Sequence, residues 1–210
     1  MKPLIMIGSG GFARECLWLL KQINQQQSQW DLKGLVAPDA PDWSSEFPYL
    51  GDDTQVIQTL GREHQFIIAI GGPKIRKELS NKFEAAGFQA ASLIHPAFQS
   101  AASVQIGAGS IICAGVQTTV NIEIGKHCII NLNTSIGHEA QIGDFCTLSP
   151  GTNISGAVKI GQSCFLGSGV NVLPGRKISP HITIGAGAVV TNHLQATGVY
   201  VGVPAKQIKN

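Results

Sequence analysis

Residues 122–161 read IEIGKHCIINLNTSIGHEAQIGDFCTLSPGTNISGAVKIG, and this stretch holds the repeat that decides the fold. The pairs Ile124-Gly125, Ile142-Gly143 and Ile160-Gly161 are separated by 18 residues each. Sampling every sixth position from 106 to 190 returns 14 aliphatic residues in 15. Self-similarity at a fixed period is the signature of a repeat architecture.

A period of six residues fits neither an α-helix nor an ordinary strand, because their apolar residues recur about every 3.6 and 2 positions. It fits a coil of three short strands joined by three corners. The positions two residues before each aliphatic face the same way along a strand, and they are small or β-branched except at Arg176. The sequence therefore predicts an all-β domain, a parallel β-helix of about five coils in which each coil buries its apolar edge against its neighbours.

The composition narrows the functional class. The chain has 210 residues, of which 43% are hydrophobic and 13% are charged, and its formal net charge of +2 argues against nucleic acid as a partner. No apolar run approaches the length of a membrane span, and Met1–Met6 lacks the features of a secretory leader, so we expect no membrane partner and a cytoplasmic location. The five cysteines include no CxxC pair, which predicts neither a disulfide framework nor a metal site.

The N-terminal segment has the pattern of a nucleotide-binding unit. The apolar run Pro3–Ile7 is followed by Gly8-Ser9-Gly10-Gly11 and then by a helical pattern, with Gly8, Gly10 and Ala13 at the positions of a G-x-G-x-x-A turn. Unpaired amides at such a helix start bind phosphate. The alternative is a tight turn without a ligand, and an NAD site is disfavoured because Ala37-Pro38-Asp39 stands where an acidic residue should end the second strand.

Strands and helices alternate through the same segment. Further strands are predicted at Lys33–Val36, Gln65–Ile70 and Phe88–Leu93, and helices at Thr54–Leu60 and Lys74–Ala86. This alternation predicts a Rossmann-like parallel α/β domain over residues 1–93, followed by the β-helix over residues 94–210. We expect the ligand of the first domain to lie beyond the carboxyl ends of the strands, near Gly8–Gly11 and Gly71-Gly72.

One coil of the β-helix carries polar residues suited to chemistry. Counting from the inward-facing Ile136 places His138 and Glu139 at a corner, pointing outward. The equivalents of His138 one coil away are Val120 and Gly156, and a histidine above a glycine leaves a groove for a long thin ligand. The alternative is a solvated corner histidine. A metal site of the carbonic anhydrase type needs three histidines, and only His127 lies close to His138.

These motifs together resemble a known family. The hexapeptide columns, the terminal Val201–Lys206 and the pair His138-Glu139 resemble the left-handed β-helix acyltransferases. With the Gly8–Glu15 turn in front, the whole chain is similar to the bacterial nucleotide-sugar acetyltransferases, which include the UDP-4-amino-sugar and perosamine N-acetyltransferases and the sialic acid O-acetyltransferase-like proteins. The resemblance implies a left-handed β-helix, acetyl-CoA as co-substrate, a nucleotide-sugar substrate, a homotrimer and a role in surface-polysaccharide synthesis.

The resemblance also implies roles for individual residues. His138 would be the general base, Glu139 its orienting carboxylate, and Asn131 would lie near the acceptor. The nucleotide would be held by Gly8, Ser9, Gly10, Gly11, Gly71, Gly72 and Arg76. The acetyl-CoA groove, between neighbouring subunits, would involve Thr147, Gly156, Ser168, Ala186 and Lys206. Thr147 departs from the family, because some relatives have a second active-site histidine there.

The implied reaction is transfer of an acetyl group to the amino group of a nucleotide-linked amino-deoxy sugar. A neutral imidazole, with an unperturbed pKa of about 6.5, can accept the proton that the attacking amine releases. Three alternatives stay open: acetylation of a sugar hydroxyl, as on a sialic acid; the same reaction on a sugar without a nucleotide; and a binding protein without catalysis. The sequence does not name the sugar or the nucleotide.

Overall fold

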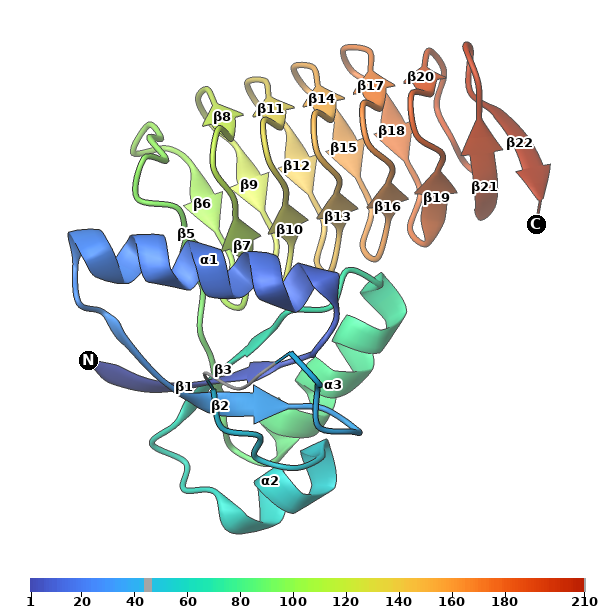
Figure 1. Cartoon of the computed structure of the whole chain (residues 1–210). Coiled ribbons are helices and arrows are strands. Elements are labelled where there is room, and N and C mark those ends of the chain that lie inside the picture. Colours follow the sequence, from blue (N-terminus) through green and yellow to red (C-terminus); the bar gives the residue numbers. More distant parts are fainter. Residues whose placement is uncertain (44–46, 210) are drawn as a thin grey trace. The chain divides into compact units, whose positions relative to one another are not determined.

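The computed structural model describes residues 1–43 and 47–209. The chain divides into one unit at Met1–Pro96, called here the α/β unit, and a second at Ala97–Asn210, called here the β-helix unit (Figure 1). The boundary predicted from the sequence lies after Leu93, whereas the first unit ends at Pro96. Across the described part of the chain, no helix combines the length and apolarity that crossing a membrane requires.

The α/β unit is built on a parallel sheet with the strand order β2-β1-β3-β4. Its strands are β1 (Lys2–Ile7), β2 (Trp30–Val36), β3 (Gln65–Ile68) and β4 (Gln89–Ala90), and its helices are α1 (Gly11–Gln26), α2 (Asp53–Thr59) and α3 (Pro73–Ala85). The central strands β1 and β3 are almost wholly buried, as expected of a parallel sheet covered on both faces. The predicted alternation of strands and helices is therefore confirmed.

Three of the predicted strand boundaries are wrong, and the simplest case is the third strand, which ends at Ile68 and not at Ile70. The second strand begins at Trp30, because the buried Trp30 and its neighbours already pair with β1, and not at Lys33. The fourth predicted strand, Phe88–Leu93, is two short strands, β4 and β5 (Leu93–Ile94). The pairing of β4 with β3 ends where Ala91 donates its N–H to the Phe66 carbonyl, so the sheet does not continue to Leu93.

The β-helix unit consists of very short strands arranged in three parallel sheets. Face 1 contains β8 (Gln117–Thr118), β11 (Ser135–Ile136), β14 (Asn153–Ile154), β17 (Asn171–Val172) and β20 (Val189–Val190). Face 2 contains β6 (Gln105–Ile106), β9 (Glu123–Ile124), β12 (Gln141–Ile142), β15 (Lys159–Ile160) and β18 (Lys177–Ile178). Face 3 contains β7 (Ile111–Ile112), β10 (Ile129–Ile130), β13 (Thr147–Leu148), β16 (Phe165–Leu166) and β19 (Ile182–Ile184), followed by β21 (Gly198–Val201) and the antiparallel β22 (Lys206–Lys209).

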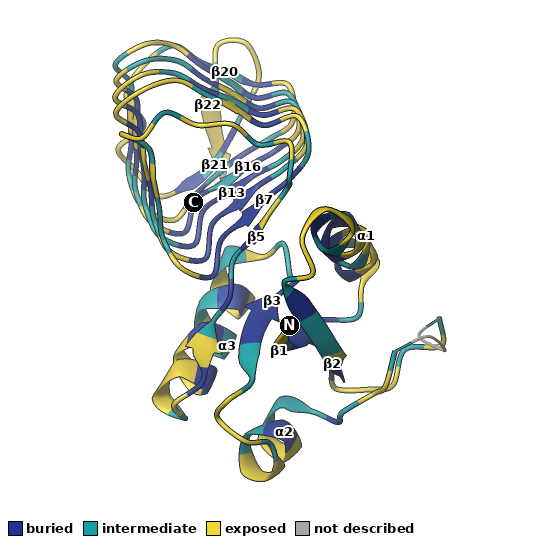
Figure 2. Ribbon diagram, turned by 90° about the vertical axis from the view of Figure 1, so that its left-hand side faces the viewer, coloured by how far each residue is buried: buried dark blue, intermediate teal, exposed yellow. Residues whose placement is uncertain are grey.

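The predicted register of the coils is confirmed. From β6 to β20, each strand pairs with the strand 18 residues away, so Ile142 lies between Ile124 and Ile160. The aliphatic columns point into the β-helix and form one continuous core, which Figure 2 shows as dark blue ribbon seen along the coils. The parallel β-helix expected from the period of six residues is thus the observed architecture.

Arg176, the exception in the inward-facing columns, is not a buried charge. Its side chain is half-buried, and its guanidinium donates through Nε to the Pro174 carbonyl at 3.0 Å and through an Nη to the Thr191 carbonyl at 3.1 Å. The guanidinium therefore forms hydrogen bonds with two backbone carbonyls near the C-terminal end of the stack of coils.

Candidate functional site

His138 lies at the edge between face 1 and face 2, on the corner that follows β11. Its side chain is 62% exposed, that of Glu139 is 61% exposed, and Nδ1 of His138 lies 3.5 Å from Oε2 of Glu139. A carboxylate at Nδ1 favours the tautomer that carries its proton there, which leaves Nε2 with an available lone pair. The corner thus presents an imidazole nitrogen able to accept a proton from a ligand.

Glu139 adopts a backbone conformation that is uncommon for glutamate. Its φ is 61°, and the equivalent corner residues Asn121, Ala157 and Gly175 have φ values of 56°, 57° and 71°. The coil geometry therefore imposes the left-handed conformation on whichever residue stands there, at a cost of order 1 kcal/mol for a residue other than glycine.

Gly156 determines where the imidazole lies. A Cβ built on Gly156 would be 2.4 Å from Nε2 of His138 and 2.6 Å from its Cε1. The ring therefore lies directly over this glycine in the next coil, and a larger residue would displace it. Among the described residues, none accepts a hydrogen bond from the Gly156 N–H, so this amide is available beside the imidazole.

The other predicted residues of the β-helix unit lie on different parts of the prism. Asn131 is at the opposite edge of face 1, on the corner that precedes β11, where its Oδ1 accepts from the Leu132 N–H at 2.7 Å. Ser168 and Ala186 stand on this same edge, between faces 3 and 1. A single chain therefore presents His138 and Gly156 on one edge of face 1 and Asn131, Ser168 and Ala186 on the other.

Two predicted acetyl-CoA residues do not lie near His138 in the chain. Thr147 belongs to face 3, which does not border the His138 edge, and it is only 4% exposed. Lys206 is exposed at the start of β22, beyond the last coil. The family resemblance assigns Thr147 and Lys206 to the acetyl-CoA groove, and that assignment stays a prediction.

The α/β unit has a cavity of about 540 Å³ at the carboxyl ends of β1, β2 and β3. Its wall includes Gly8, Ser9, Gly10, Gly11 and Gly71 from the predicted nucleotide-binding residues. Gly10 is the N-cap of α1 and has no side-chain capping bond, and a Cβ at Gly10 or Gly11 would meet nothing within 4 Å. The start of α1 therefore faces open space with its backbone donors, as phosphate binding requires.

Gly8 is needed at this turn for steric reasons. Its φ is +123°, and an added Cβ would be 2.8 Å from the Ala69 carbonyl oxygen. Its N–H donates to the Val36 carbonyl at 2.9 Å. The residue thus lets the end of β1 pass close to the segment after β3.

Arg76 and Gly72 are not part of the cavity wall. Arg76 is fully buried, and its guanidinium donates to the Ile70 and Gly71 carbonyls at 2.8 and 3.0 Å. Gly72 is the N-cap of α3. Arg76 therefore stabilises the turn that forms one wall, and a direct contact with a nucleotide would require it to leave these carbonyls.

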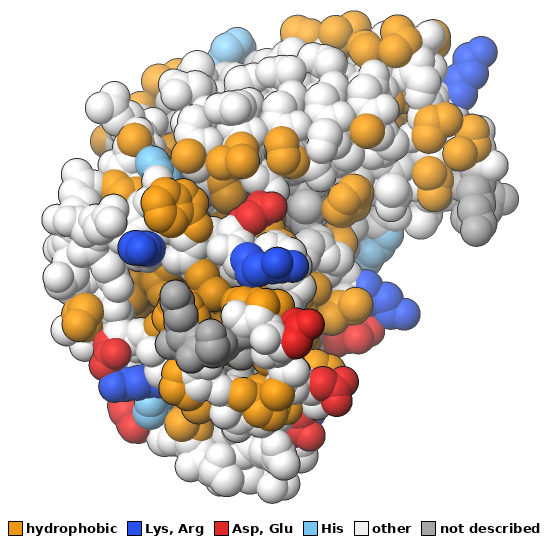
Figure 3. Space-filling view, viewed as in Figure 1, with side chains coloured by type: hydrophobic (Ala, Val, Ile, Leu, Met, Phe, Trp, Pro, Cys, Tyr) orange, Lys and Arg blue, Asp and Glu red, His pale blue; other side chains and the backbone are white. Residues whose placement is uncertain are grey.

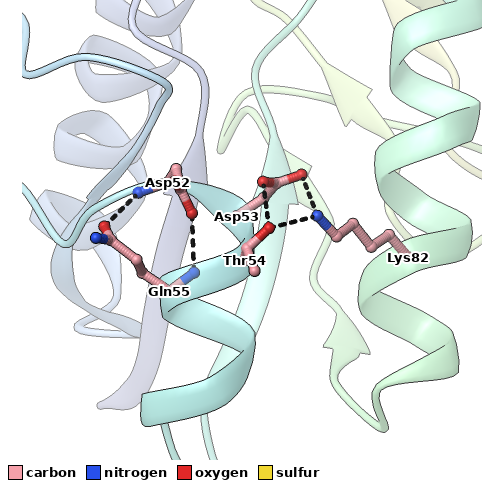
Figure 4. A network of polar contacts seen from close by, with 5 residues as sticks. All are labelled: Asp52, Asp53, Thr54, Gln55 and Lys82. Carbon is pink, nitrogen blue, oxygen red and sulfur yellow. Dashed lines mark hydrogen bonds and ion pairs between the residues drawn. The ribbon is translucent and has the colours of Figure 1, made fainter.

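Asp53 also lines the cavity, although no sequence motif points to it. Its Oδ2 accepts from Nζ of Lys82 on α3 at 2.8 Å, and the same Nζ donates to Oγ1 of Thr54 at 3.0 Å (Figure 4). The preceding Asp52 caps α2 and forms a capping box with Gln55. This capping pattern, visible in the sequence, marks the helix start and places the next carboxylate in its first turn.

The remaining histidine of interest, His127, has a structural environment. It is 1% exposed, lies on the edge between faces 2 and 3, and stacks on Phe145 with ring centroids 5.2 Å apart. His138 is on a different edge, so the two do not converge. Within residues 1–43 and 47–209, no group of three or more His, Cys, Asp or Glu side chains is arranged to hold a metal ion.

Three cysteines form a ladder inside the β-helix. Cys128, Cys146 and Cys164 are buried, and each thiol donates to a corner carbonyl of the next coil at 3.1 to 3.2 Å. The hydrogen bond with Cys164, together with burial, raises the pKa of the Cys146 thiol. A protonated, inaccessible Cys146 acts as a packing residue and not as a nucleophile.

Comparisons with known proteins agree with this architecture. Residues 3–83 match the family model described as the PglD N-terminal domain. A comparison with curated protein sequences gives no match. Perosamine N-acetyltransferase from Caulobacter crescentus, solved in complex with CoA and GDP-perosamine, is 30% identical, with a TM-score of 0.89 and coverage of 98% of this chain and 97% of that one.

Two further solved structures share the fold along nearly their whole length. The acetyltransferase domain of PglB from Neisseria gonorrhoeae, in complex with acetyl coenzyme A, is 24% identical with a TM-score of 0.88, and the match covers 99% of each chain. WeeI from Acinetobacter baumannii is 25% identical with a TM-score of 0.85, and the match covers 98% of this chain and 99% of that one.

Proposed function

We propose that this chain, which belongs to the family of β-helix sugar acetyltransferases that includes perosamine N-acetyltransferase, acetylates the amino group of a nucleotide-linked amino-deoxy sugar. It is an acyltransferase with an α/β unit and a left-handed β-helix, and acetyl-CoA is the donor. The Caulobacter enzyme binds both CoA and GDP-perosamine, which supports the same pair of substrate classes here. We expect the reaction to occur in the cytoplasm and to serve polysaccharide synthesis.

His138 is the general base in this proposal, and its geometry is the observation that carries it. The imidazole is exposed, its Nδ1 is near the Glu139 carboxylate at 3.5 Å, and its Nε2 lies over Gly156 with space beside it. As the sugar nitrogen bonds to the acetyl carbon, Nε2 takes the proton that the nitrogen releases. Positioned bases of this kind contribute roughly 10²- to 10⁴-fold to the rate.

Glu139 and Gly156 complete the arrangement. The carboxylate stabilises the imidazolium that forms on His138. The Gly156 N–H, which no described residue uses, is suited to donate to the oxygen of the acetyl group as that oxygen becomes negative. When bound, acetyl-CoA would supply the thioester, whose C–S bond would break after the C–N bond has formed, and the proton on His138 would pass to the departing sulfur.

The separation of the predicted residues on face 1 supports a site shared between subunits. Ser168 and Ala186 lie on the edge opposite to His138 and Gly156. A thin ligand held between the His138 edge of one subunit and the Ser168 edge of another would contact both sets, as a homotrimer with sites between subunits requires. We propose this assembly, with Asn131 near the acceptor and Lys206 at the far end of the CoA groove.

The test is an acetylation assay on the purified protein. It would be incubated with acetyl-CoA and UDP-, GDP- or dTDP-linked 4-amino-4,6-dideoxy sugars, with a sialic acid as the hydroxyl acceptor, while free thiol release is followed. Release with a nucleotide amino sugar, lost in His138→Ala at unchanged thermal stability, is the expected result. Release with the sialic acid alone would replace N-acetylation by O-acetylation, and no release with any acceptor would favour a binding protein.

A matched pair of variants tests the position of the imidazole. Gly156→Ala should push the His138 ring aside and lower kcat by on the order of 10²-fold, because small displacements of catalytic groups have effects of this size. Ser155→Ala, in the same corner, should leave kcat near that of the wild type. Equal activity of both variants would remove Gly156 from the proposal.

A further inference from the structure

The segment before α2 runs alongside β2 and acts as an additional strand of the α/β unit. Leu35 donates its N–H to the Pro48 carbonyl at 2.8 Å and accepts from the Leu50 N–H at 2.9 Å. Beyond it, the Ala37 N–H donates to the Gly51 carbonyl at 3.2 Å. The bridge between Leu35 and Tyr49 is parallel, so this segment ends at the same edge of the sheet as β2.

This pairing brings a carboxylate, that of Asp53, to the cavity at the end of β2, where the residues that follow β2 supply no carboxylate. In dinucleotide-binding folds an acidic residue near the end of the second strand accepts hydrogen bonds from the ribose. Here Ala37 and Pro38 line the cavity, whereas Asp39 is exposed and is not part of its wall. Asp53, two residues after the paired segment, lines the same cavity, as does Val36 near the end of β2.

The Asp53 carboxylate is held in place from both sides. Lys82 of α3 binds its Oδ2 at 2.8 Å, and the capping box of Asp52 with Gln55 fixes the turn on which it stands (Figure 4). The side chain keeps 31% of its surface exposed. Among the described residues that line the cavity, Asp53 is the only charged one.

We propose that Asp53 selects the nucleoside part of the substrate by accepting hydrogen bonds from a pair of adjacent donors. A carboxylate is purely an acceptor and repels phosphate, so it must face a donor-rich part of the ligand. The free amides at the start of α1 hold the phosphates on the glycine side of the cavity. A few such polar groups in a mostly apolar cavity determine its specificity.

Two parts of a nucleotide have the required chemistry. The ribose presents two neighbouring hydroxyls, and guanine presents N1–H beside its amino group. Uracil and thymine offer one ring N–H only, and a deoxyribose lacks one hydroxyl. This inference rests on the proposed nucleotide-sugar acceptor and adds the residue that recognises it.

The test measures binding of GDP, UDP, IDP and 2′-deoxy-GDP to the full chain by calorimetry. Asp53→Asn should weaken GDP binding by roughly 10- to 100-fold, the effect of losing a hydrogen bond to a charged group. If the ribose is the donor, UDP loses as much, and 2′-deoxy-GDP binds the wild type weakly. If guanine is the donor, UDP is unaffected, and IDP, which lacks the amino group, binds the wild type weakly.

Two control variants separate a direct contact from a structural effect. Lys82→Gln removes the ion pair but keeps the carboxylate, so its GDP binding should stay much closer to that of the wild type. Asp39→Asn, outside the cavity wall, should change nothing. In the acetylation assay, Asp53→Asn should raise KM for the nucleotide amino sugar and leave KM for acetyl-CoA unchanged.

The outcomes that overturn the inference are distinct from those that overturn the proposed function. If Asp53→Asn binds GDP and UDP as the wild type does, or if Lys82→Gln loses as much as Asp53→Asn, the carboxylate is not a direct contact, while the acetyltransferase proposal stands. If the wild type binds none of the nucleotides, the nucleotide-linked acceptor is wrong and the inference falls with it.

Discussion

The two units of this chain are held together by different kinds of contact, repeated in one unit and unrepeated in the other. In the β-helix unit, equivalent residues 18 positions apart stack on one another, so each contact is repeated along the prism. In the α/β unit, each contact is made once, as when Arg76 holds the Ile70 and Gly71 carbonyls. Charged side chains on the face shown in Figure 3 gather on the α/β unit, whereas the β-helix there is mostly uncharged.

This difference predicts where substitutions matter. In the β-helix, the direction of a strand side chain determines its effect, because an inward residue such as Ile142 is part of a continuous core and an outward residue such as Asn153 is exposed to solvent. In the α/β unit, the identity of single residues determines the effect, because one glycine or one helix cap supports a contact that is made only once. Substitutions in the two units, with matched controls, therefore test this contrast.

Ile142→Glu should destabilise the β-helix most. The side chain is 3% exposed and stacks between Ile124 and Ile160, so a carboxylate there would be buried without a partner. We expect a loss of roughly 3–5 kcal/mol in the free energy of unfolding, measured by denaturant titration with circular dichroism. The outward neighbour gives the control, since Gln141→Glu should change little; equal losses would mean that the assigned direction is wrong.

In the α/β unit, adding a single methyl group should lower the free energy of unfolding most at Gly8, in the variant Gly8→Ala. The new Cβ would meet the Ala69 carbonyl at 2.8 Å and would hold alanine at a φ of +123°. The expected loss is about 1–3 kcal/mol. All three tryptophans lie within residues 1–96, so their fluorescence reports this unit. Gly10→Ala, whose Cβ meets nothing, should leave the transition in place, and a shift of similar size in both would contradict the steric argument.

Asp52→Ala should have a smaller effect in the same unit. It removes the capping box at the start of α2, in which Asp52 accepts from the Gln55 N–H at 2.8 Å. Loss of such a cap costs about 1 kcal/mol, again measured by tryptophan fluorescence. Asp42→Ala, an exposed residue outside any helix, is the matched charge control. No difference between the two would show that α2 does not depend on its cap.

Asn153→Ala should have the smallest effect, although it breaks more hydrogen bonds than the other changes. Its side chain links Ser135 and Asn171 in neighbouring coils at 2.7 and 3.1 Å, on the exposed surface of face 1. Water replaces these bonds, so we expect a loss of about 0.5 kcal/mol. Gln117→Ala in the same column is the reference. A loss approaching that of Ile142→Glu would mean that outward columns also hold the stack together.

How well the site residues could be predicted from the sequence also differs between the β-helix unit and the α/β unit. His138 could be placed by counting from Ile136, because every coil repeats the same directions. Its relation to Glu139 is local and was also predictable. The same count places Thr147, which the family resemblance assigns to the acetyl-CoA groove, on face 3, away from His138 of the same chain.

Asp53 shows why the α/β unit was harder to interpret. Its entry into the cavity depends on the segment before α2 pairing with β2, as in the hydrogen bond from Ala37 to Gly51. No period links these positions, and the intervening stretch has no strand pattern. The sequence pointed to the glycines of the cavity, whose turn pattern is local, and missed the carboxylate, whose position is not.

The amino-acid sequence by itself determined the β-helix, its register and the outward corner of His138, because a six-residue period allows one arrangement of inward and outward faces. Only the tertiary structure decided that Arg76 is buried behind its turn and that Asp53 lines the cavity of the α/β unit. The physical reason is that these two features depend on unrepeated contacts, which no periodic spacing of the chain indicates.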